Sequence, residues 1–122
     1  MADSHPSHSE TMKTRLRGDL RAAMKRGDKA ETSLLRQLIA VLDNAEAVPA
    51  PEESASLVRH VFGEGTNEVE RRQLGHNDIR ALLQWELDAR REAAGELARL
   101  GADARSAALA SEAAMIGRYL SE

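Results

Sequence analysis

Apolar residues recur at the spacing of an α-helix through most of this 122-residue chain. In the first such stretch they stand every four positions, which keeps them on one slowly drifting stripe of a helix. The apolar fraction of 42% comes mainly from Ala and Leu, and few β-branched or aromatic residues are left to build a sheet. We therefore expect an all-α fold: a small helical domain of two helix hairpins with an irregular middle segment.

The first hairpin is predicted from two helical patterns, at about residues 12–26 and 29–47. Gly27 between them can adopt the left-handed conformation of a helix C-cap, and Asp28 followed by Glu31 has the form of a capping box. The second helix should bury a wide face. That face carries Leu34, Leu35, Leu38, Ile39, Val41, Leu42 and Ala45.

The segment 48–76 is predicted to be a variable linker, because Pro49 and Pro51 end the preceding helix. A short helix over 51–62 is expected within it, with 63–76 irregular. Asn77 is then a good N-cap for a third helix that ends at Gly101, and a fourth helix is predicted from about Asp103 to Leu120.

The N-terminal residues and the composition of the chain exclude several classes of protein. Residues 1–11 are polar and lack apolar periodicity, so they predict a disordered N-terminal tail before a helical domain over 12–122. The absence of Cys excludes disulfides, thiolate metal sites and a cysteine nucleophile. No apolar stretch is long enough to span a bilayer, and no hydrophobic signal region opens the chain. We expect a cytoplasmic protein without a membrane partner.

A search for common catalytic and cofactor motifs finds none: HExxH, GxSxG, GxxxxGK[ST] and GxGxxG are all missing. The histidines at positions 5, 8, 60 and 76 do not stand at the spacing of metal ligands. We predict no catalytic residue, no cofactor and no metal, so an enzyme acting on its own is the least expected class.

A ladder of cations is the feature that most suggests a binding function. Lys13, Arg17, Arg21 and Lys25 stand every four positions, and Arg26 and Lys29 extend the ladder. Such a ridge can contact the phosphate backbone of a nucleic acid. It can equally be a solvated face whose side-chain stems cover an apolar seam, which the sequence alone favours. The net charge of −3 provides no global attraction to nucleic acid.

The predicted third helix adds three residues of interest. Trp85 is expected to be a partly buried packing residue, with an exposed interface anchor as the alternative. Arg90 and Arg91 can mark a partner surface or a solvated face. Glu86 precedes Arg90 by one helical turn and is expected to form an exposed pair with it.

Two long segments together resemble the YqeY family. They read LRGDLRAAMKRGDKAETSLLRQLIAVLDNAEA and DIRALLQWELDARREAAGELARLGADARSAALASEAAMIGRYL. The most specific parts are the AMKRGDK turn at 23–29 and the ELDARREAA stretch at 86–94. The family shares a fold with the tail of GatB, a subunit of the amidotransferase that converts misacylated Glu-tRNA or Asp-tRNA. The resemblance implies a link to tRNA but no amidation chemistry, because the catalytic centres lie outside that tail.

Members of this family usually continue past the YL near position 120 into a Pro-containing linker and a second helical subdomain. This sequence stops at Glu122, so we expect that subdomain to be absent. The resulting hypothesis is a non-catalytic, tRNA-associated module. Its expected contact residues are Arg17, Arg21, Lys25, Arg26, Lys29, Arg90 and Arg91. The alternative is a protein-interaction or dimerisation module, with another protein or itself as the partner, that does not bind tRNA.

Overall fold

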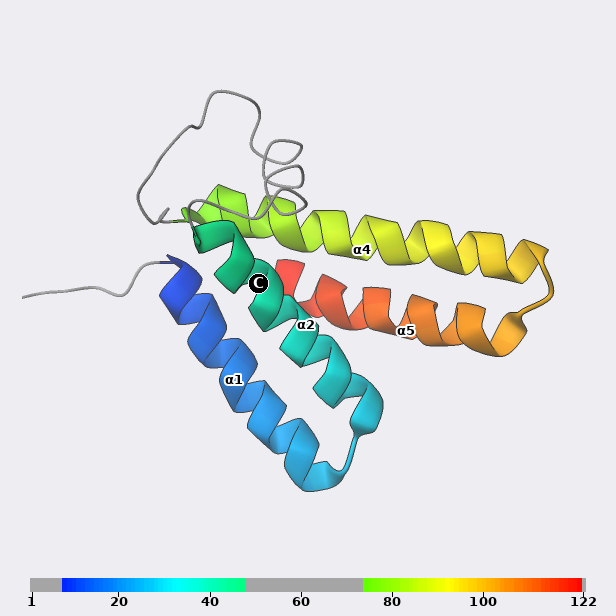
Figure 1. Ribbon diagram of the computed structural model, residues 1–122, viewed down its shortest axis with the longest axis horizontal. Coiled ribbons are helices and arrows are strands. Elements are labelled where there is room, and N and C mark those ends of the chain that lie inside the picture. Colours follow the sequence, from blue (N-terminus) through cyan, green and yellow to red (C-terminus); the bar gives the residue numbers. More distant parts are fainter. Residues whose placement is uncertain (1–7, 48–73, 122) are drawn as a thin grey trace, which may run out of the picture. The chain divides into compact units, whose positions relative to one another are not determined.

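The computed structural model describes residues 8–47 and 74–121, and about 90% of this part is helical with no strand. Its helices are α1 (His8–Arg26), α2 (Lys29–Glu46), α4 (His76–Arg99) and α5 (Asp103–Leu120) (Figure 1). The prediction of an all-α fold is confirmed. The expected short helix at 51–62 and the irregular segment after it to residue 73 lie outside the described residues.

The chain divides into two compact units, Met1–Ile79 and Arg80–Glu122. The boundary falls within α4, after its first turn. The division follows the hairpins, because helices that are neighbours in the sequence are also partners in space.

In the first unit, α1 and α2 run antiparallel and pack against each other (Figure 1). Most of the predicted apolar face of α2 is buried, but Ile39 and Val41 are only partly buried. Its buried apolar residues are Leu34, Leu35, Leu38, Leu42 and Ala45, and α1 contributes Leu16 and Ala23. Removing these side chains from water is the main force that holds the two helices together.

The start of α1 corrects the prediction of a disordered tail over 1–11, because the helix already begins at His8. Glu10 lies in its first turn, where a negative charge interacts favourably with the helix dipole. The carboxylate of Glu10 also lies 3.7 Å from the ammonium of Lys13, one turn further on. Residues 1–7 of the predicted tail lie outside the described part.

The turn between α1 and α2 uses Gly27 as predicted, with φ of +73°. Its N–H donates to the Met24 carbonyl at 3.1 Å, and the N–H of Asp28 donates to the Ala23 carbonyl at 2.9 Å. This pair of bonds is a Schellman motif. Asp28 then caps α2 by accepting from the N–H of Glu31 at 3.0 Å. The other half of the capping box does not form, because the Asp28 N–H is already used.

In the second unit, α4 and α5 form another antiparallel hairpin (Figure 1). Gly101 has φ of +80°, and the same Schellman bonds close the turn: Gly101 to Ala98 at 3.1 Å and Ala102 to Leu97 at 2.8 Å. Unlike Asp28, Ala102 provides no side-chain cap for the following helix.

The predicted N-cap at Asn77 is wrong, because α4 already begins at His76, two residues before the start that this cap implies. Gly75 stands at the cap position, and its N–H donates to the Asp78 carboxylate at 2.9 Å. Asp78, at the third position of the helix, therefore accepts a hydrogen bond from the N–H of the cap residue, as the third residue of a capping box does. Leu74, the residue before this cap, is buried.

Candidate nucleic-acid interface

The cationic ladder on α1 does not lie on a single face. One residue of an α-helix turns by about 100°, so four residues overshoot a full turn by about 40° and three such steps by about 120°. The drift carries Lys13 to the buried side, with 3% exposure, while Lys25 at the other end of the ladder is exposed. The same drift turns Met24, the last residue of the apolar stripe, out to 51% exposure.

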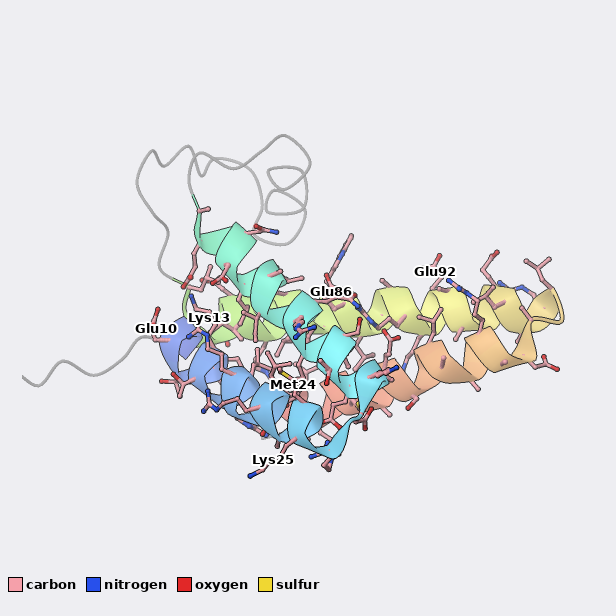
Figure 2. The ribbon with its side chains drawn as sticks, turned by 60° about the horizontal axis from the view of Figure 1, so that its bottom comes forward. Glu10, Lys13, Met24, Lys25, Glu86 and Glu92 are labelled. Atoms are coloured by element: carbon pink, nitrogen blue, oxygen red, sulfur yellow. The ribbon has the colours of Figure 1, made fainter. Side chains whose placement is uncertain are left out.

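Lys13 is held in a cluster of carboxylates that joins the start of α1 to the end of α2. Its ammonium donates to Glu46 at 2.6 Å and to Asp43 at 2.9 Å, and Glu10 lies beside it on α1 (Figure 2). The Glu46 side chain is only 6% exposed. Burial by itself lowers the pKa of Lys13, but its hydrogen bonds to Glu46 and Asp43 outweigh this and raise the pKa above 10.5.

The next cations of the ladder, Arg17, Arg21 and Lys25, are all exposed. We call these three residues the basic face. None of them forms an ion pair or hydrogen bond through its side chain with the residues that the structure describes. The Lys25 side chain points away from the hairpin (Figure 2). The basic face therefore carries positive charge that no carboxylate of the described hairpin offsets.

Two further predicted contact residues lie at the turn beside this face. Lys29, the first residue of α2, is exposed and also has no acidic partner in the described part of the chain. Arg26 is paired, since its guanidinium donates to Glu31 at 2.8 Å, but its side chain remains 54% exposed. An exposed pair of this kind contributes little to stability, so Arg26 can exchange Glu31 for another anion at low cost.

Arg90 differs from these residues, because it bridges the two helices of the second hairpin. It donates to Glu86 on α4 at 2.7 Å and to Glu112 on α5 at 2.8 Å. Its side chain is 11% exposed, so the pair with Glu86 is largely buried and the expectation of an exposed pair is wrong. Burial lowers the pKa of Arg90, whereas its bonds to Glu86 and Glu112 raise it, with a net increase. The two carboxylates offset its charge locally.

The other residues of interest on α4 and at the turn after it are exposed to solvent. Arg91 is exposed and makes no ion pair within the described ranges. Trp85 is 37% exposed and belongs with the exposed large apolar residues of the described part, not with its buried ones. Leu100, next to the turn at Gly101, is 78% exposed.

A concavity of 680 Å³ lies at the turn end of the first hairpin, and sequence reasoning did not predict it. Residues of α2 form most of its lining, and Met24 of α1 also contributes to it. The lining residues are Met24, Gly27, Lys29, Thr32, Ser33, Arg36, Gln37 and Ala40. The set contains two cations and no carboxylate. The exposed end of the drifting apolar stripe at Met24 was the signal that could have indicated it.

Within residues 8–47 and 74–121, no group of three or more His, Asp or Glu side chains is placed to hold a metal ion. No helix of this part combines the length and hydropathy needed to cross a bilayer. The described residues thus define a small all-α protein of two helical hairpins, one of which carries an uncompensated basic face. Comparison with known proteins finds no family, no curated protein and no solved structure that matches this chain.

Proposed function

We propose that this chain is a non-catalytic helical module that binds the phosphate backbone of RNA. The resemblance to the YqeY family suggests tRNA as the RNA. The contact surface consists of the basic face together with Arg26 and Lys29. The observation that carries the proposal is the exposure of Arg17, Arg21 and Lys25 without any carboxylate partner in the described residues.

The basic face differs from Lys13, the cation of the same helix that is buried and paired with carboxylates. On the inner side of α1, the chain surrounds a cation with Glu10, Asp43 and Glu46. On the outer side, successive turns present cations that attract counterions from solution instead. Phosphates that replace those counterions release them, and this release favours binding.

The alternative, a protein-interaction or dimerisation module, draws on Leu100 and Trp85, the exposed apolar residues of the second hairpin. Single exposed apolar residues are common on protein surfaces and do not by themselves mark an interface. The cationic surface is therefore the better supported of the two candidates.

The test is fluorescence anisotropy of labelled tRNA, titrated at low and at physiological salt. The wild-type chain is compared with Arg17→Glu/Arg21→Glu and with Arg105→Glu/Arg118→Glu. The second pair is a matched control, because Arg105 and Arg118 are also exposed and have no ion pair in the described part, and both variants change the net charge equally.

We expect the wild type to bind more tightly than the ~10⁻⁴–10⁻⁶ M of nonspecific complexes, and the affinity to fall with salt. The variant of the basic face should lose about tenfold or more, whereas the control should stay within about threefold. Equal losses would show that only total charge matters, which contradicts the proposed surface. No binding at either salt, together with a dimer by light scattering, would favour the interaction module.

A further inference from the structure

We propose that the concavity at the turn of the first hairpin binds one unstacked nucleotide of a single-stranded RNA segment. This inference rests on the proposed function, since the basic face delivers the RNA backbone to the turn. A volume of 680 Å³ lies within the range of ~300–1,000 Å³ that is usual for small-molecule sites. A duplex can contact the basic face as well, but its bases stay stacked and cannot enter.

The charge of the lining favours a phosphate. Lys29 and Arg36 both border the concavity, and none of its lining residues is acidic. Lys29 is exposed and makes no ion pair with the described residues. Lys25 and Lys29 stand on either side of the turn, so phosphates that follow α1 along the basic face reach Lys29 at the edge of the concavity.

Arg36 and Met24 provide a surface for a base. The Arg36 Nη2 lies 3.8 Å from the Met24 sulfur, and no carboxylate of the described residues pairs with this guanidinium. Unstacked RNA bases stack on aromatic rings or on the plane of an Arg guanidinium, and the polarisable thioether of Met adapts to flat ligands. No Phe, Tyr or Trp occurs in α1 or α2, and the Arg36 guanidinium is the planar group among the residues that line the concavity.

Polar groups on the same side of α2 can read the nucleotide. Thr32, Ser33 and Gln37 line the concavity. The Ser33 hydroxyl oxygen accepts from the Gln37 amide at 3.2 Å, which leaves the hydroxyl hydrogen free to donate. A hydroxyl donor beside a phosphate-binding cation suits a ribose 2′-OH or a base edge.

The experiment is NMR titration of the full chain, observing backbone amides and the Met24 methyl group. The probes are a short oligouridine and a short blunt RNA duplex. We expect amides of the basic face to shift with both RNAs, and Met24, Ser33 and Gln37 to shift with oligouridine only. If the basic face shifts and these three stay silent with oligouridine, the nucleotide site is wrong while the proposed function stands. If the basic face shifts with neither RNA, both are wrong.

Two conservative variants separate stacking from charge. Arg36→Lys keeps the charge but removes the planar guanidinium, and should weaken oligouridine binding about tenfold while duplex binding stays within about twofold. Arg105→Lys is the matched control, because Arg105 is exposed, makes no ion pair with the described residues and lies outside the proposed contact surface. Its affinity for both RNAs should stay within about twofold. Equal effects of the two variants on oligouridine would overturn the nucleotide site.

Discussion

The two hairpins turn in the same way but hold their helices together differently. Gly27 and Gly101 both adopt positive φ and close a Schellman motif. In the first hairpin a buried cation, Lys13, joins the open ends of the helices, whereas in the second Arg90 bridges the helices along their length. Lys13 and Arg90 are surrounded by carboxylates, and the cations on the outer side of α1 are not. The difference between inner and outer cations is the basis of the proposed function.

The largest expected effect comes from replacing the buried cation of the first hairpin. Lys13→Met removes the ammonium that donates to Glu46, a residue that is only 4% exposed. Breaking a buried ion pair from one side costs about 3–5 kcal/mol, because the remaining charge stays out of water. Urea unfolding followed by circular dichroism measures the loss. Lys25→Met, on the basic face of the same helix, is the control and should change stability by less than about 0.5 kcal/mol. Equal effects would contradict the contrast between inner and outer cations.

Arg90→Met is the corresponding change in the second hairpin and should cost less, about 1–3 kcal/mol. The side chains of Glu86 and Glu112 are 17% and 23% exposed, so water can reach both carboxylates once the guanidinium is gone. Arg91→Met on the exposed side of α4 serves as the control in the same unfolding experiment. A larger loss for Arg90→Met than for Lys13→Met would reverse the comparison between the two hairpins.

The two turns differ in their side-chain caps, and this predicts a smaller effect. Asp28→Ala removes the bond to the Glu31 N–H and should lower the free energy of unfolding by about 1 kcal/mol. Ala102→Ser gives α5 the cap that it lacks and should raise it by about 0.5 kcal/mol. Ala104→Ser, inside the same helix, is the control without a capping role. Thermal unfolding midpoints of the three variants measure the predicted loss for Asp28→Ala and the predicted gain for Ala102→Ser.

A change of pH near neutrality should have the smallest effect on the contribution of Lys13 to the free energy of unfolding. The pKa of Lys13 is raised in the folded state by Glu46 and Asp43, so its contribution is complete below the ordinary pKa of 10.5 and is lost as pH rises through the higher folded value. The stability difference between the wild type and Lys13→Met should therefore be constant near neutrality and shrink in strong alkali. A difference that grows with pH would contradict the ion-pair cluster.

Local signals predict most of the fold because they act within a few residues. The ends of α1 and α4, the start of α2 and both glycine turns follow from Gly27, Asp28 and Gly101, whose effects do not depend on distant contacts. The start of α4 was mispredicted even so, because Asn77 and Asp78 are both good capping residues. Only the backbone geometry shows that Asp78 binds the N–H of Gly75.

The candidate site was less predictable because it depends on contacts between helices. Glu46 lies 33 positions from Lys13 and Glu112 lies 22 positions from Arg90, so the neutralisation of both cations is invisible in local patterns. The four-residue ladder gave the right residue types but not their exposure, since its drift around α1 takes Lys13 inward. The concavity depends on α1 and α2 meeting at the turn, which no single segment reveals.

The salt dependence of tRNA affinity tests the basic face most directly. The slope of log K against log salt counts the phosphates that the protein neutralises. We predict that Arg17→Met/Arg21→Met reduces the magnitude of this slope by about two, whereas Arg105→Met/Arg118→Met leaves it unchanged. An unchanged slope in the first variant, or equal reductions in both, would contradict RNA binding through the outer cations of α1.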